Sequence, residues 1–457
     1  MVRGRTVFAS VLGAALAAAP GIGTAATGEL PNLGPHVDVA RMPSGATTIV
    51  QRLSGAPVAA IELWYRAPAT GFGPKPRPSL ARLAAQVVAA SKPLVGEALG
   101  PLVKASGGRL AITVYSDSLE IAAVVPLVAA RAVVKTMTTV YFAPVLTDTG
   151  FRIAQRDVAQ EALLEGFNPE TIARDAVFAS LFSNEPQHSP ALGSPQDVAA
   201  LTIADARAYA TRAFRSQNAV LVISGAVDPS IVTAAVAGRP ETGDLAQTEA
   251  HASGQVVNAP GPVQRVFDEP SGGYGWIGPP IAAEREATAL DFIADYLFGG
   301  DTGYVTHALA VSNPDAFVVG QFITLYDPGV LFVGYSGKQP DALRAKIDEG
   351  VGIVRKPLPP PAFAAAVVAF RYHLLRDLQT PAELADNFGW YTVEGNPEYA
   401  PGVNGAQGKY FAAVDSLTPD FVAAVAEKYL GHPAATVTLR PAPPKAPAPA
   451  PSPQATP

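Results

Sequence analysis

One short pattern occurs twice in this chain and constrains its fold more than any other feature. A predicted helix that begins at Leu201-Thr202 is followed by an apolar strand, residues 218–227. A predicted helix that begins at Leu417-Thr418 is likewise followed by a strand, residues 435–439. The same unit closing two segments of similar length indicates an internal duplication. We therefore expect two related halves.

Helices and strands are predicted throughout both halves. Apolar runs and two-residue alternation predict strands at 37–40, 46–51, 56–65, 109–115, 118–125, 316–325 and 330–335. Helical periodicity, caps and Gly or Pro stops predict helices at 79–88, 99–105, 147–163, from 168, 283–298, 340–354 and 361–378. We therefore predict an α+β fold, in which each half-domain is an antiparallel sheet packed by helices.

Composition shifts along the chain set the predicted domain boundaries. Residues 1–26 have the basic start, apolar run and small residues of a secretory signal peptide; an uncleaved membrane anchor is the alternative. The N-terminal domain is placed at 27–236 and the C-terminal domain at 263–440. Residues 237–262 suit a linker, and the Pro- and Ala-rich residues 441–457 suit a disordered tail.

Charge and cysteine content narrow the function. The chain has no cysteine, so it has neither disulfides nor thiolate zinc ligands. Its formal net charge is −6 and it has no basic cluster, which argues against nucleic-acid binding. No stretch after the signal peptide is long enough to span a membrane. We expect an exported protein, most simply of a bacterial periplasm.

The helix predicted at 79–88 carries the most informative chemistry. Its apolar residues follow the i, i+3, i+4, i+7 spacing of a helix that faces a core, and Ser79 stands at the N-cap position. Arg82, Ala85 and Gln86 are expected together on the opposite face.

This stretch resembles the zinc helix of the insulinase/pitrilysin family, which includes the mitochondrial processing peptidases and carries H-x-x-E-H at this place. Further similarities lie at 107–110, 156–158, 192–195 and 218–228. The resemblance implies two related α/β domains that face each other like a clam shell. It also implies that Arg82, Ala85 and Gln86 replace the His, Glu and His of the motif, so the zinc site is degenerate.

The other functional positions of the family are also changed. By the spacing of the family, its third zinc ligand falls on Ala162, and we predict that Arg82 pairs with Glu165 in place of the metal charge. The edge strand that binds substrate carries Ala111 at a position commonly held by Asn. The Arg and Tyr that the second domain usually supplies fall on Ala310 and Phe317, and Phe lacks the hydroxyl that polarises a carbonyl.

The resemblance thus predicts a chain that is not itself an enzyme and holds no cofactor. We expect a non-catalytic subunit that forms a heterodimer with an active H-x-x-E-H zinc peptidase, completes its substrate chamber and contacts peptides. The first alternative is a stand-alone periplasmic peptide-binding or scaffold protein. The second is a peptidase with relocated catalytic residues, although the chain has no G-x-S-x-G elbow and its six His residues are scattered.

Overall fold

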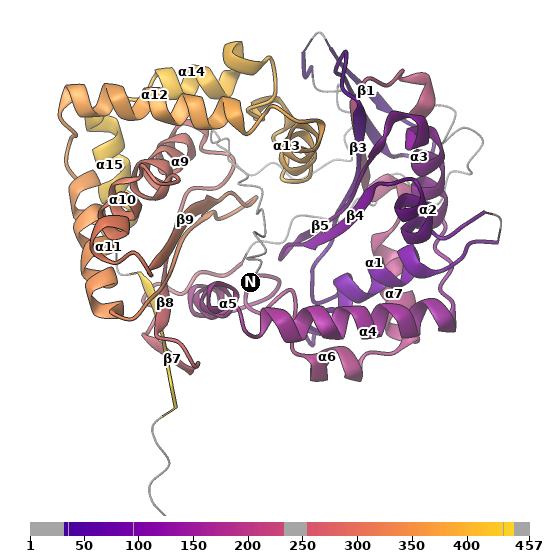
Figure 1. Cartoon of the computed structure of the whole chain (residues 1–457), viewed down its shortest axis with the longest axis horizontal. Helices are drawn as coiled ribbons and strands as arrows, with labels where there is room; N and C mark the ends of the chain where they lie inside the picture. The colour runs from indigo at the N-terminus through magenta and orange to yellow at the C-terminus, as the bar shows by residue number, and fades with distance from the viewer. Residues whose placement is uncertain (1–31, 35, 95, 233–253, 433, 443–457) are drawn as a thin grey trace, which may run out of the picture.

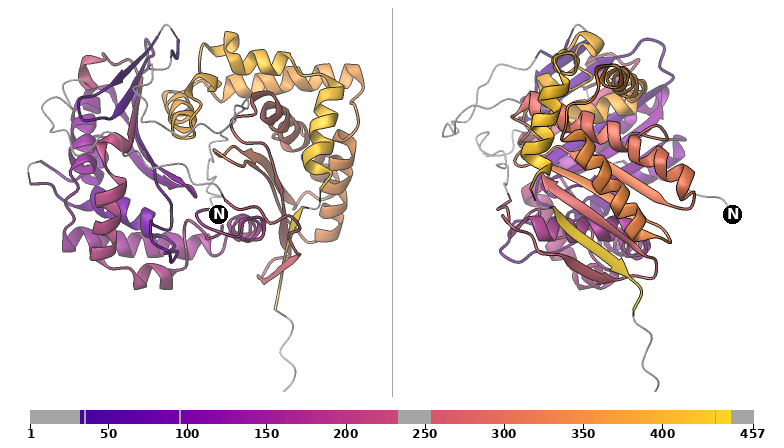
Figure 2. Two further views of the ribbon diagram at one scale, coloured as in Figure 1. Left: turned by 180° about the vertical axis from the view of Figure 1, so that it is seen from behind. Right: turned by 90° about the vertical axis from the view of Figure 1, so that its left-hand side faces the viewer.

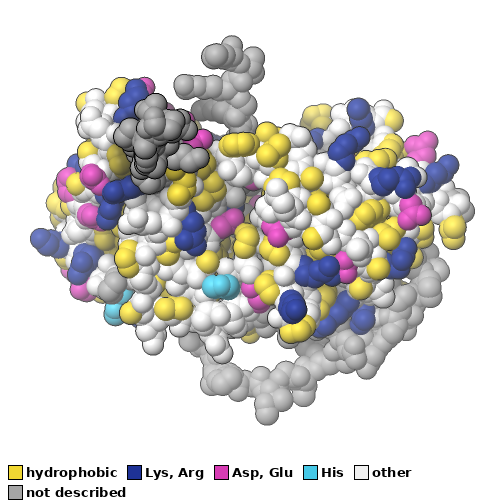
Figure 3. All heavy atoms as spheres, turned by 90° about the horizontal axis from the view of Figure 1, so that it is seen from below, with side chains coloured by type: hydrophobic (Ala, Val, Ile, Leu, Met, Phe, Trp, Pro, Cys, Tyr) yellow, Lys and Arg dark blue, Asp and Glu magenta, His cyan; other side chains and the backbone are white. Residues whose placement is uncertain are grey.

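The computed structural model describes residues 32–34, 36–94, 96–232, 254–432 and 434–442. The predicted signal peptide, much of the predicted linker and most of the predicted tail lie outside these residues. None of the helices in the described part is both long and apolar enough to cross a membrane. On the face seen from below, acidic and basic side chains are interspersed (Figure 3).

The first half contains a six-stranded sheet with the order β1-β2-β6-β3-β5-β4. Its strands are β1 Val37–Arg41, β2 Thr47–Arg52, β3 Val58–Arg66, β4 Arg109–Val114, β5 Ser118–Pro126 and β6 Ala219–Gly225. Its helices are α1 Leu80–Ala90, α2 Leu99–Ala105, α3 Leu127–Phe142, α4 Asp148–Glu165, α5 Pro169–Leu181, α6 Pro195–Ala200 and α7 Ile203–Ala213. Among these elements, α3 and α6 had not been predicted.

The second half contains a five-stranded sheet with the order β7-β11-β8-β10-β9. Its strands are β7 Val263–Val266, β8 Ser271–Ile277, β9 Phe317–Ile323, β10 Val330–Ser336 and β11 Ala435–Arg440. Its helices are α9 Glu284–Phe298, α10 Tyr304–Ser312, α11 Pro340–Val354, α12 Pro360–Arg376, α13 Pro381–Val393, α14 Lys409–Asp415 and α15 Pro419–Leu430. The strands β7 and β8 and the helices α10, α13 and α14 had not been predicted.

The two sheets have the same topology. Strands β2, β6, β3, β5 and β4 correspond in order to β7, β11, β8, β10 and β9. In each sheet the first of these pairs is parallel and the others are antiparallel. The two halves face each other across the molecule (Figure 1). The predicted α+β fold of two related halves is therefore confirmed.

Each half covers its sheet on the outer face with its own helices. Because successive strand residues point to opposite faces, Ile61 and Leu63 of β3 pack into one core cluster and Ala60 and Trp64 into the other. The first cluster is formed by helices such as α1, α3 and α7. In the second half, α10, α11 and α15 cover the corresponding outer face (Figure 2).

The inner faces are covered by helices that the two halves exchange. Helix α5 of the first half packs on β8, β10 and β11, and α13 of the second half packs on β3 and β6. Strand β8 is rich in glycine at this contact: a Cβ added at Gly275 would lie 2.2 Å from Cγ1 of Val177 on α5. Glycine is therefore needed where the helix approaches the strand this closely.

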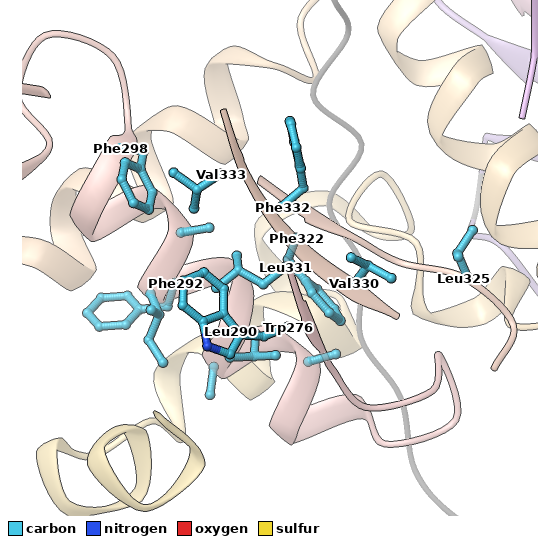
Figure 4. Close-up of a cluster of buried hydrophobic side chains, with 14 of the residues drawn as sticks. Trp276, Leu290, Phe292, Phe298, Phe322, Leu325, Val330, Leu331, Phe332 and Val333 are labelled. Atoms are coloured by element: carbon cyan, nitrogen blue, oxygen red, sulfur yellow. The ribbon is translucent and has the colours of Figure 1, made fainter. Parts of the chain in front are cut away.

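The exchange joins both halves through one large core. Buried residues of the first sheet, including Trp64 and Val222, belong to the same cluster as the second-half core. Part of that core, where Trp276 and Phe322 approach Leu290 and Phe292 of α9, is drawn in Figure 4. Burial of apolar surface contributes about 25 cal/mol per Å² to the free energy of folding, so this shared core holds the two halves together.

Candidate functional site

Helix α1 lies at the centre of the first half, against α4, α7 and β4. Its start differs in one respect from the prediction. Ser79 has the N-cap position but a left-handed backbone, with φ 68°, and its side chain makes no capping hydrogen bond. Its hydroxyl instead accepts a hydrogen bond from the backbone N–H of Gly193, 2.9 Å away. Ser79 therefore anchors a distant loop.

The three motif positions of α1 do not share one environment. Nη1 of Arg82 donates a hydrogen bond to Oε1 of Gln86 (3.1 Å), so these two side chains do lie together as predicted. Ala85 is fully buried, and its carbonyl accepts a hydrogen bond from the hydroxyl of Tyr141 (2.9 Å). The expectation that Ala85 shares the face of Arg82 is therefore wrong, because the core extends under this turn of the helix.

The predicted ion pair between Arg82 and Glu165 is also wrong. Nε of Arg82 donates to Oε1 of Glu161 (3.1 Å), and its Nη2 lies 2.7 Å from Oε2 of the same carboxylate. Glu165 lies about one turn further along α4, where its carboxylate accepts hydrogen bonds from Asn168 and Thr171. Residues at the start of α5 therefore bind the carboxylate of Glu165, which the prediction pairs with Arg82.

These residues do not fit a zinc ion. Zinc is held by imidazole, thiolate or carboxylate ligands. Arg82 offers a cation, Ala85 and Ala162 offer methyl groups, and both alanines are buried. Gln86 offers an amide already bonded to Arg82. Arg82, at a position that the resemblance assigns to a zinc ligand, is instead paired with Glu161.

A pocket of about 350 Å³ opens beside this ion pair. Its lining residues are Arg82, Gln86, Gly100, Val103, Lys104, Gly108, Leu110, Ala111 and Ile112. Strand β4, which carries Ala111, is the last strand of its sheet and has β5 on one side only. An edge strand presents unpaired backbone N–H and C=O groups. The pocket thus lies next to a free sheet edge.

The two positions that the resemblance assigns to the second half, Ala310 and Phe317, lie outside this pocket. Ala310 is an exposed residue of α10. Phe317 begins β9, the edge strand of the second sheet, and its side chain is half exposed. Neither residue lines the pocket, whose walls come entirely from the first half. Ala310 and Phe317 therefore take no part in this pocket.

A second group of ionisable residues, which the sequence did not reveal, lies between the halves. Carboxylate oxygens of Glu62 (β3), Glu120 (β5) and Asp386 (α13) lie within 4.8 Å of one another. Burial raises the pKa of Glu120 to about 7. Burial, then repulsion by Glu120, raises the pKa values of Glu62 and Asp386 well above their usual range. The sequence signal for this cluster was a single carboxylate within each of the apolar segments that form β3 and β5.

A neighbouring group contains the opposite charge. Arg66 of β3 donates hydrogen bonds to the carbonyl of Val393, at the end of α13. Burial raises the pKa of Asp117 to about 6, and Arg66 opposes that rise. Burial and the charge of Asp117 raise the pKa of Glu394. The contact between α13 and the first sheet is therefore rich in buried carboxylates.

Comparison with known proteins agrees with this architecture. Residues 200–356 match the family model of the peptidase M16 inactive domain. A comparison with curated protein sequences finds no match.

Three similar solved structures cover 89% of this chain each. A protease from Helicobacter pylori has a TM-score of 0.76 at 15% identity, with 100% of that chain covered. A putative M16-like peptidase from Alicyclobacillus acidocaldarius has a TM-score of 0.73 at 16% identity, with 98% covered. A peptidase M16 inactive domain from Pseudomonas fluorescens has a TM-score of 0.72 at 15% identity, with 98% covered. The predicted resemblance is thus confirmed: residues 200–356 match the M16 inactive-domain family, and most of the chain shares its fold with these three structures.

Proposed function

We propose that this chain is the non-catalytic subunit of an exported insulinase-type zinc peptidase and holds substrate peptides for an active partner. One observation carries the proposal: the helix that resembles the zinc helix is packed against α4 and α7, and its Arg82 is paired with Glu161 instead of offering a metal ligand. The leader-like residues 1–26 support export.

The residues at the motif positions support a non-catalytic role. A zinc peptidase needs a metal that activates water and a carboxylate that accepts the proton of that water. Buried Ala85 cannot accept a proton, and Arg82 repels a second cation. Phe317 has no hydroxyl to stabilise an oxyanion. Catalysis would therefore come from the partner, which would carry the zinc.

The free edge of β4 supports a role in holding peptide. An extended peptide can add to a sheet edge through backbone hydrogen bonds, while pockets along the edge select its side chains. The pocket that contains Lys104 and Gln86 lies directly beside β4. A peptide could bind to both the free edge of β4 and the pocket without any metal.

The test is co-purification of the tagged full-length chain from its native extract, followed by metal analysis and a peptidase assay. We expect a zinc-bearing homologue at equal stoichiometry, with peptide hydrolysis only in the complex. A metal-free single species that binds peptides would instead favour the stand-alone peptide-binding scaffold. Hydrolysis by the purified chain alone would favour a peptidase with relocated catalytic residues.

A further inference from the structure

The pocket beside β4 is rich in hydrogen-bond donors. An arginine has five N–H groups, and the contacts of Arg82 with Glu161 and Gln86 engage three of them. The amide nitrogen of Gln86 has no acceptor among the described residues, because only its oxygen is bonded. Lys104 is exposed and forms no ion pair within the described part of the chain. Three side chains thus offer unused donors to one space.

Nothing that lines the pocket opposes these donors. None of the nine lining residues carries a carboxylate. Glu161, the acid that contacts Arg82, is bonded to it through both oxygens, so this pair is close to neutral. The ammonium of Lys104 then gives the pocket a net positive charge. Charge-assisted hydrogen bonds to a carboxylate are about twice as strong as neutral ones, so this chemistry favours an anion.

The register of β4 explains how a peptide side chain would enter the pocket. Leu110 and Ile112 alternate with Ala111 along the strand and pack toward the core that α1 and α2 share. A strand added to the free edge of β4 follows the same alternation, and side chains opposite one another lie about 5 Å apart. Every second peptide side chain would therefore lie on the side of Leu110, Ile112 and the pocket.

We propose that the pocket beside the Arg82–Glu161 pair binds a carboxylate, and that Lys104, Gln86 and Arg82 there select an acidic group of a peptide that lies along β4. This inference rests on the proposed peptide-holding function and adds the substrate class. The carboxylate is supplied by a Glu or Asp side chain or by the peptide C-terminus. The pocket volume of about 350 Å³ lies at the small end of the range for ligand pockets and has room for one such group.

The test measures fluorescence anisotropy of labelled, extended peptides on the purified full-length chain, or on its complex where co-purification yields one. The peptides carry Glu or Gln at the centre, each with a free or an amidated C-terminus. We expect the carboxylate to strengthen binding about tenfold or more, with an effect that weakens as salt is added. Whether the central Glu or the free terminus produces the effect identifies the source.

Two matched lysine substitutions test whether Lys104 causes the preference for the carboxylate peptide. Lys104→Gln should abolish the preference for the carboxylate peptide, because it removes the unpaired cation without disturbing the core. Lys92→Gln removes another exposed lysine, which does not line the pocket, and should leave the preference unchanged. Equal binding of all peptides would overturn the pocket but leave the peptide-holding role intact. No binding of any peptide would overturn both.

Discussion

Replacing Glu120 by Gln should weaken the pH dependence of stability of this protein. Glu120 is buried beside Glu62 and Asp386, whose carboxyl groups repel it when they are ionised. Its pKa rises from an ordinary 4.5 to about 7 in the folded state. The folded chain therefore binds more protons than the unfolded chain between these values, and stability must fall as the pH rises through them.

The size of the effect follows from the pKa difference. Each pKa unit corresponds to about 1.4 kcal/mol, so ionisation of Glu120 would lower the free energy of unfolding by about 3 kcal/mol once the pH exceeds 7. A change of this size moves Tm by about 6–12 °C, taking 2–4 °C per kcal/mol for a domain of 150–250 residues. Glu62 and Asp386 act in the same direction, because their pKa values are also raised.

Differential scanning calorimetry between pH 5 and pH 8 tests this reasoning. The Tm of the wild-type chain should fall toward pH 8, and Glu120→Gln should fall less because its amide never ionises. Glu97→Gln, which neutralises an exposed carboxylate, is the matched control and should follow the wild type. A Tm profile that is flat in the wild type, or equally steep in Glu120→Gln, would refute the inference that ionisation of buried Glu120 lowers stability.

Three further substitutions test the packing around the site and between the halves. Arg82→Ala should lower stability by about 1 kcal/mol, measured by urea unfolding, because Glu161 is exposed enough to be rehydrated; no change would mean that the pair is not formed in solution. Gly275→Ala should lower stability by about 1–3 kcal/mol in the same assay, because its Cβ would overlap Val177 of α5. Phe388→Ala should cost about 3–5 kcal/mol and raise amide exchange in α13, since the ring is fully buried; exchange confined to the second sheet would contradict the packing of α13 on the first.

Local signals in the sequence were sufficient for most of the elements. The helix starts at Thr202, Asn168 and Thr418 all occur as predicted, because the caps that form there depend on residues within one turn. The repeated helix–strand unit predicted the two related halves, because each copy carries its own local signals. The motif spacing placed Arg82 and Gln86 side by side, because residues four apart are neighbours on a helix.

The tertiary structure decided which side chains meet across the chain. Glu161 rather than Glu165 pairs with Arg82, because the start of α5 binds Glu165. The cluster of Glu62, Glu120 and Asp386 joins positions far apart in sequence, through the packing of α13 on the opposite half. Hydrophobic periodicity shows that a helix has a buried face but not which sheet covers it. The sequence by itself therefore determined most of the elements, their duplication, and the absence of His and Glu from the helix that resembles the zinc helix. The exchange of α5 and α13, the Arg82–Glu161 pair and the buried acids depend on contacts that exist only once the two halves have packed.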